Sequence, residues 1–270
     1  ASSHHVDRLV LTRRLVERDV GGRYRGSTLG LLWSLLTPLL MLGVYTLVFG
    51  TVFKARWSTP EGTGPASAGT SMIEFAIILF AGLIVFQLFA EVITRAPGVV
   101  LANQNYVKKI VFPLEILVPV ALGSALFHAA VSLAVLLAFM LPVYGGVPWT
   151  ALLLPLVLGP YCLMILGLGW FLASLGTYVR DIGQVLGTLV TALMFLSPIF
   201  FPFSALPAWI RPWLVLNPVA LPVEEARNLL IFGRLPDFAA LAVYGVAAVA
   251  VCGLGYLWFQ ITRKGFADVL

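Results

Sequence analysis

The stretch LGLLWSLLTPLLMLGVYTLVFGTVF, residues Leu29–Phe53, carries no charged side chain. A helix needs about 20 apolar residues to cross the hydrocarbon core of a bilayer, and this stretch exceeds that length. It follows directly on the basic stretch ERDVGGRYRGST, which begins at Glu17. The pattern predicts a membrane-spanning helix with a positively charged flank.

The whole chain has the composition of a membrane protein with several spans. Hydrophobic residues make up 60% of its 270 residues and charged residues only 11%, and the mean hydropathy is +0.98. Soluble domains carry about a quarter charged residues, so these values exclude an ordinary soluble domain. The apolar runs are continuous rather than alternating, which argues against a β-barrel. We therefore predict an all-α polytopic membrane protein with no cleaved leader, because the first span is too long for a signal peptide.

Six apolar runs approach or exceed the length of a membrane span. They are Leu29–Phe53, Ile73–Ile93, Leu114–Leu141, Thr150–Leu175, Val185–Phe201 and Phe238–Ile261. An even number of spans puts both termini on one side, and 12 of the 17 lysines and arginines fall on that side. Cytoplasmic loops are enriched in these residues, so both termini are predicted to be cytoplasmic. The net charge of +5 is thus a sign of topology rather than of nucleic-acid binding.

Two cytoplasmic segments are candidates for contact with a partner. Residues 1–28 form a predicted interfacial segment in which the helix Val6–Val20 ends at Gly21-Gly22. Its apolar face is expected to hold Val6, Leu9, Val10, Val16 and Val20, with Leu11 and Leu15 opposite. Residues 96–113 form a predicted coupling loop: a short polar-tipped helix bounded by Pro97-Gly98 and Pro113, or alternatively a plain loop.

The external segment 202–236 combines many apolar residues with six prolines. It is too apolar for a soluble loop and too interrupted for a span. We expect short re-entrant helices that enter the outer leaflet and return. The alternative is a loop that lies flat on the membrane surface. Trp209 and Trp213 in this segment are candidates for an external gate or for membrane anchors.

The chain lacks the motifs of an energy-converting enzyme. No Gly-x4-Gly-Lys-Ser/Thr phosphate loop and no clustered metal ligands are present, so energy is expected from a partner. Glu74, Glu91 and Glu115 fall near predicted span ends, where snorkelling or capping explains them. His128 falls in mid-span, but a lone histidine bonded to a neighbouring helix is as good an explanation as a functional one. We therefore do not include it among the predicted site residues.

Three stretches resemble the permease subunits of ABC-2 transporters, specifically those that export lipid-linked O-antigen polysaccharide. They are ERDVGGRYRGSTLGLLWSLLTPLL, NQNYVKKIVFPLEILVPV and SPIFFPFSALPAWIRPWLVLNPVALPVEEARNLL. The resemblance runs in order over nearly the whole chain, which would make residues 1–270 a single ABC-2 transmembrane domain. The third stretch departs from the pattern, because two acids precede Arg227 where relatives usually have one acid and an aromatic residue.

The resemblance implies a non-enzymatic permease of the bacterial plasma (inner) membrane. It implies a homodimer with a channel at the dimer interface and two ATP-binding cassette subunits, which would hold ATP and Mg; this chain would hold no cofactor and bind no nucleic acid. The implied substrate is undecaprenyl-linked polysaccharide of the O-antigen type. Teichoic-acid, capsule, or simpler lipid or drug export are alternatives within the family. A membrane enzyme acting on polyprenyl phosphate is a different alternative, which would need clustered acids that the sequence lacks.

Particular residues acquire roles by this resemblance. Those expected at the ATPase are Glu17, Arg18, Asp19, Asn103, Gln104, Asn105, Tyr106, Lys108 and Lys109. Arg23, Tyr24 and Arg25 would border the cytoplasmic mouth, where guanidinium groups suit a lipid diphosphate. From the residues themselves, aromatic faces on the first span suit sugar rings. The candidates for this channel are Trp33, Tyr45, Phe49 and Phe53, with ordinary core packing as the alternative.

Overall fold

A computed structural model describes residues 2–23, 32–48, 72–104, 112–201, 214 and 216–266. Within these ranges every regular element is a helix. Four helices are long and apolar enough to cross a membrane: Ile73–Val99, Leu114–Tyr144, Trp149–Tyr178 and Phe238–Gly265. Two shorter apolar helices, Leu32–Val48 and Ile182–Leu196, stand where the first and fifth spans were predicted. The all-helical prediction is confirmed.

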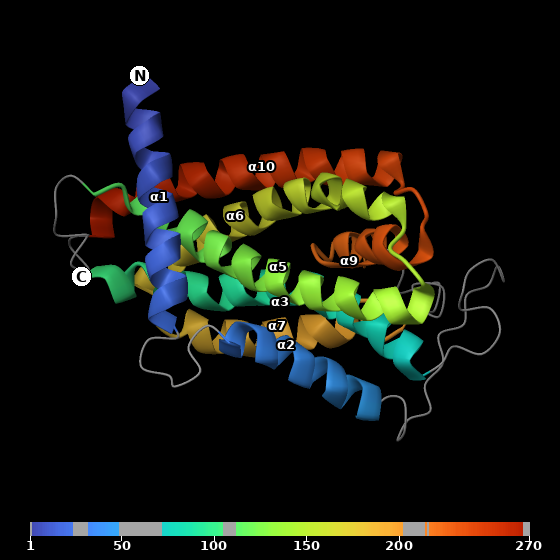
Figure 1. Cartoon of the computed structure of the whole chain (residues 1–270). Helices are drawn as coiled ribbons and strands as arrows, with labels where there is room; N and C mark the ends of the chain where they lie inside the picture. The colour runs from blue at the N-terminus through green and yellow to red at the C-terminus, as the bar shows by residue number, and fades with distance from the viewer. Residues whose placement is uncertain are drawn as a thin grey trace.

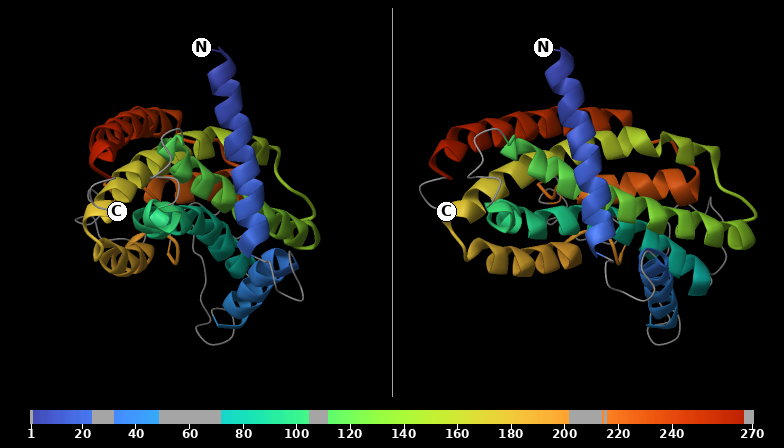
Figure 2. Two further views of the ribbon diagram at one scale, coloured as in Figure 1. Left: turned by 90° about the vertical axis from the view of Figure 1, so that its left-hand side faces the viewer. Right: turned by 60° about the vertical axis from the view of Figure 1, so that its left-hand side comes forward.

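The elements follow one another in the order of the predicted runs. They are α1 (Ser2–Arg23), α2 (Leu32–Tyr45), α3 (Met72–Val99), η2 (Leu101–Asn103), η3 (Leu114–Ile116), α5 (Leu117–Tyr144), η4 (Trp149–Leu153), α6 (Leu154–Tyr178), α7 (Ile182–Leu196), α9 (Ala220–Arg227), η6 (Asn228–Phe232), α10 (Phe238–Thr262) and η7 (Arg263–Gly265). Figure 1 shows α10 and α6 along one side of the bundle and α7 and α2 on the other. In both views of Figure 2, α1 lies across the bundle rather than along it.

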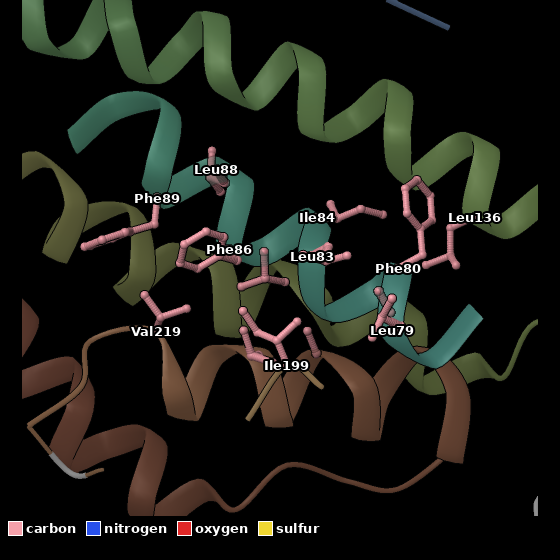
Figure 3. Packing of buried hydrophobic residues seen from close by; sticks show 14 of the residues in the cluster. Leu79, Phe80, Leu83, Ile84, Phe86, Leu88, Phe89, Leu136, Ile199 and Val219 are labelled. Atoms are coloured by element: carbon pink, nitrogen blue, oxygen red, sulfur yellow. The ribbon is translucent and has the colours of Figure 1, made fainter. Parts of the chain in front are cut away.

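Helix α3 is the centre of the bundle. Its most apolar window is 89% buried, against 33% for the α6 span and 17% for the α5 and α10 spans. Figure 3 shows Phe80 of α3 beside Leu136 of α5, while Ile199 and Val219 lie on the opposite side of the same helix. An all-round apolar sequence is what a helix needs when neighbours surround it. Helices α5, α6, α7 and α9 pack directly on α3, whereas α10 packs on α6 and α1 on α5.

Glycines allow two pairs of helices to approach closely. A Cβ atom at Gly255 of α10 would overlap the Gly167 carbonyl of α6, so these helices meet backbone to backbone. A Cβ atom at Gly176 of α6 would overlap Pro97 of α3. Small residues serve this purpose in membrane helices, where close packing replaces the hydrophobic drive between helices.

Two predicted helix ends are wrong. Helix α1 passes through Gly21 and Gly22 to Arg23, and α3 passes through Pro97 and Gly98 to Val99. A glycine costs a helix about 1 kcal/mol and a proline about 3 kcal/mol, but tertiary packing can outweigh these local preferences. Pro97 is packed against α6, and the residues before the two α1 glycines are packed against α5. Residues 96–99 therefore belong to α3, and the loop that was predicted to couple to a partner begins after Val99.

The predicted apolar face of α1 is also wrong in part. Leu9 is 72% exposed, whereas Leu11 and Leu15, expected on the opposite face, are half-buried. Val16 packs against Gly123 of α5, where a Cβ atom would lie 2.6 Å from the valine side chain. Val20 is buried, as expected of the apolar face. The face that packs on α5 therefore includes residues 15, 16, 19 and 20, and it contains a carboxylate.

The two ends of the bundle gather different segments. At one end Arg263 of η7 donates to Glu115 of η3 at 3.0 Å, and the end of α3 packs on the start of α5. Helix α1 lies at this same end, so α1 and the end of α10 share one side of the bundle. At the other end, Thr150 of η4 donates to the Leu229 carbonyl of η6, and α9 is buried against α3 and α6.

Candidate functional site

A polar cavity lies between α2, α3 and α5. Its volume is about 460 Å³, within the 300–1,000 Å³ or so of small-molecule sites. Arg23, the last residue of α1, lies at its edge. Polar side chains enter it from all three helices: Ser34 and Thr37, Gln87 and Glu91, and His128 and Ser132. Charged and polar groups inside a membrane bundle mark functional sites because they are costly to keep there.

A first set of ionic contacts fastens α1 beside this cavity. Arg95 of α3 donates to both carboxylate oxygens of Asp19, with Nη1 at 2.6 Å from Oδ2. Ser124 of α5 donates to Asp19 Oδ2 at 2.7 Å. Burial disfavours the charged carboxylate, yet the hydrogen bonds from Arg95 and Ser124 outweigh it and hold the pKa of Asp19 below its usual value. Asp19 is therefore an ionised anchor that joins three helices.

A second set of contacts lies one helical turn further on. Arg23 Nη2 of α1 lies 2.7 Å from Glu91 Oε1 of α3. His128 Nδ1 of α5 lies 3.0 Å from the same carboxylate oxygen. Because an ionised carboxylate only accepts, Nδ1 carries a hydrogen here and donates to Glu91. This set faces the cavity, whereas the Asp19 set borders a small cleft of about 50 Å³.

The two sets together form a two-rung contact that we call the charged clasp. It consists of Asp19 and Arg23 on α1, Glu91 and Arg95 on α3, and Ser124 and His128 on α5. The members on each helix are four residues apart, so each pair occupies one face. On both α1 and α3 an acid precedes a base by four residues, and the two helices meet in opposite directions, so that each acid faces the base of the other helix. A shift of α1 by one turn along its own axis would bring like charges together, so the clasp fixes the register of α1 on α3.

The predicted ATPase-contact residues divide into two groups. Arg18, Asp19 and Asn103 line the same small cleft, so the structure brings α1 and the start of the coupling loop together. Glu17 instead points outward, where it accepts from Arg13 at 2.9 Å. Gln104 is the last described residue before the gap at 105–111. The predicted residues Asn105, Tyr106, Lys108 and Lys109 lie outside the described ranges.

The predicted channel aromatics are placed only in part. Tyr45 lines the cavity, but Trp33 is 39% exposed and does not line it. Phe49, Phe53, Trp209 and Trp213 lie outside the described residues, as do Tyr24 and Arg25. Their roles stay predictions.

Sequence reasoning missed Glu91 and His128. Glu91 was assigned to a span end because the predicted span stopped at Ile93, but α3 continues to Val99 and holds Glu91 two turns inside. Snorkelling does not explain it, because its carboxylate is paired with Arg23 and His128. The sequence did offer a signal: Glu91 and Arg95 are four residues apart on one predicted helix. The pairing is seen only in the folded chain, where Asp19 and Arg23 of α1 contact Arg95 and Glu91.

Arg227 of α9 is a second buried cation, at the other end of the bundle. It was counted among external loop residues, but it is 3% exposed and donates to the carbonyls of Ile78, Pro198 and Ile199. Its guanidinium lies where a Cβ atom at Gly82 would be. Arg227 thus joins α9 to α3 and to the residues that follow α7.

The long apolar helices and their internal polar contacts define a multi-pass membrane protein. A family profile described as "ABC-2 type transporter" matches residues 10–231, and the chain belongs to this family. It is 26% identical over 257 residues to a Myxococcus xanthus protein named O-antigen export system permease protein RfbA, covering 94% of this chain and 93% of that one. It is 29% identical over 261 residues to the Escherichia coli Polysialic acid transport protein KpsM, covering 94% of each. A Klebsiella pneumoniae RfbA is 23% identical over 258 residues, covering 95% of this chain and 93% of that one.

Proposed function

We propose that this chain is the permease subunit of an ATP-driven exporter that moves undecaprenyl-linked polysaccharide of the O-antigen type across the bacterial plasma membrane. The observation that carries the proposal is the match to named polysaccharide permeases over 94% of the chain. Their names concern chemically different polymers, so the shared sequence fits a common transport task rather than one sugar. Permeases of this family work with an ATP-binding subunit.

The complete transporter would contain two copies of this chain and two ATP-binding subunits that hold ATP and Mg. Six spans would place both termini in the cytoplasm, with segment 202–236 entering the outer leaflet as a gate. The charged clasp supports a route for force within each permease. It joins α1 to α3, and α3 leads directly into the coupling loop at Asn103. A push on that loop would thus reach α1, α3 and α5 together.

The lipid diphosphate head would meet the arginines at the cytoplasmic mouth, and the sugar chain would follow the aromatic side chains of the first span. Arg23 is already paired with Glu91, so Arg25 would take the larger share of the diphosphate charge. Trp209 and Trp213 would line the external exit.

Reconstitution tests this function directly. The chain and its ATP-binding partner would be placed together in proteoliposomes with lipid-linked polysaccharide, and polymer that reaches the opposite side would be measured with and without ATP. ATP-dependent transfer is expected, and Arg25→Ala should reduce it while the matched change Arg14→Ala, on the exposed face of α1, leaves it unchanged. Absence of transfer with every polymer tested would refute the proposal.

Capsule export is a second candidate, because a relative that is 29% identical to this chain is named a polysialic acid transport protein. The same proteoliposomes decide between the two. Faster transfer of an acidic capsule polymer than of an O-antigen polymer would favour the capsule.

A further inference from the structure

The cavity between α2, α3 and α5 contains a polar group whose presence the helix packing does not explain. Every side chain of α3 from Phe75 to Ala90 is buried except that of Gln87. Gln87 opens into the cavity, and no residue in the described ranges hydrogen-bonds its carboxamide. Because Gln87 is exposed to the cavity, the donors and acceptors of its carboxamide are available to a molecule that enters there. The carboxamide is therefore a candidate contact for a ligand in this cavity.

The charges around the cavity limit the class of that ligand. Glu91 sits between Arg23 and His128, so its carboxylate already balances the guanidinium. A phosphate or carboxylate that approached these cations would meet Glu91 as well, and a cationic ligand would meet Arg23. A hydroxyl group meets neither difficulty, because it can donate to Glu91 and accept from Arg23 or Gln87.

The remaining walls fit a ligand with both hydroxyl and C–H surfaces. Thr37 and Ser132 add hydroxyl groups from α2 and α5. Tyr45 and Phe80 add aromatic rings at the same cavity. Aromatic rings pack well against the C–H face of a sugar ring, while the ring's hydroxyls bond to polar groups at its edge. The cavity volume of about 460 Å³ is within the range of sites for small ligands.

We propose that this cavity, enclosed by helices of one subunit, binds a neutral, hydroxyl-rich sugar unit through Gln87, Glu91 and Arg23. Arg23 is also predicted to border the cytoplasmic mouth and Tyr45 to lie on the sugar path, so this cavity adjoins both proposed regions. It rests on the proposed function, because a polysaccharide exporter is what would bring sugar units to this part of the bundle. The site would select neutral glycosyl units over acidic ones, and the pairing of Glu91 is the reason.

Sugar binding to the purified chain in lipid nanodiscs tests the site without transport. The probes are methyl α-mannopyranoside, methyl β-glucuronide and inorganic pyrophosphate, detected by saturation-transfer NMR. The wild-type chain should bind the mannoside at least about tenfold more tightly than the glucuronide, and pyrophosphate at equal concentration should not displace the mannoside. Gln87→Leu should weaken mannoside binding by about tenfold, the effect of losing roughly one to two hydrogen bonds. The matched change Thr191→Val, on the exposed face of α7, should leave it unchanged.

Glu91→Gln gives a signature that a merely structural role would not produce. It removes the negative charge that excludes anions, so glucuronide should gain affinity relative to mannoside. Thermal unfolding of each variant would establish that it remains folded, and Gln87→Leu should remain so because leucine suits an apolar helix. Displacement of the mannoside from the wild-type chain by pyrophosphate at equal concentration would overturn the proposal, as would unchanged mannoside binding in Gln87→Leu. These outcomes are distinct from failure of the exporter function, in which reconstituted transporters would move no polymer.

Discussion

The substitution Asp19→Asn keeps the shape of the side chain but removes the charge that holds Arg95. The wild-type carboxylate accepts two bonds from Arg95 and one from Ser124. Asparagine keeps one acceptor oxygen and presents its NH₂ group to the guanidinium, where two donors cannot pair. The change should therefore loosen α1 from α3 and α5 without altering the packing volume.

The size of the effect follows from the exposure of the pair. Breaking a buried ion pair by removing one partner costs about 3–5 kcal/mol, whereas exposed pairs contribute about 1 kcal/mol or less. The side chains of Arg95 and Asp19 are 33% and 23% exposed, which places the pair between these limits. We expect a loss of about 2 kcal/mol in the docking of α1, equivalent to roughly a 30-fold change in its opening equilibrium.

Hydrogen exchange in nanodiscs measures this opening. Amides of α1 from Arg13 to Val20 should exchange about 30-fold faster in Asp19→Asn, whereas those of α10 should not change. Glu17→Gln is a matched control, because Glu17 lies on the same helix in an exposed pair with Arg13 and should change exchange by less than about threefold. Equal effects of the two substitutions would refute the role of the clasp.

Three further predictions follow from single contacts. The pKa of Asp19 in the folded chain lies below the ordinary value of 3.8. Its contribution to the docking of α1 is therefore complete above that value and is lost as the pH falls through the folded pKa. The free energy of α1 docking, measured by hydrogen exchange corrected for intrinsic rates, should be constant from about pH 8 to 5 and should fall below about pH 4. Gly255→Ala should lower the stability of the α6–α10 pair by about 1–3 kcal/mol in thermal unfolding, because the added methyl group would overlap the Gly167 carbonyl. Gly253→Ala is the control and should not lower it, because nothing lies within 4 Å of a Cβ atom there. Similar melting temperatures for the two variants would contradict the close approach of the helices. Arg227→Met should cost at least about 3 kcal/mol in the same assay, because three buried carbonyls lose their donor, and a melting temperature within 2 °C or so of wild type would count against this.

The helical architecture could be read from the sequence with good accuracy. Spans of uninterrupted apolar residues can be only helices in a bilayer, since every backbone group must be satisfied within the segment. The start of α10 at Phe238 matches the prediction, and Asp237 explains it by accepting from the amides of Ala239 and Ala240 at 3.0 Å. The turn after α5 also follows from its sequence, because Gly145 adopts a φ of 73° that favours glycine.

The candidate site was less predictable, because its members lie far apart in the chain. Asp19 and Arg23 are in the first helix, while their partners Glu91, Arg95 and His128 come from two others. Each of these charges has an ordinary explanation when taken alone. The sequence offers one pattern that could have joined them: an acid followed four residues later by an arginine occurs on both α1 and α3.

By itself, the sequence determined that this protein is a bundle of apolar helices with a basic end, and it indicated the ABC-2 family through its three motif stretches. Only the tertiary structure decided that α3 is the buried centre and that Gln87 and Glu91 face a cavity. The physical reason is that lipid tails are as apolar as a protein core, so hydropathy cannot distinguish a helix surrounded by lipid from one surrounded by other helices. That distinction depends on which side chains meet, and here it was decided by glycine contacts, by Arg227 and by the charged clasp.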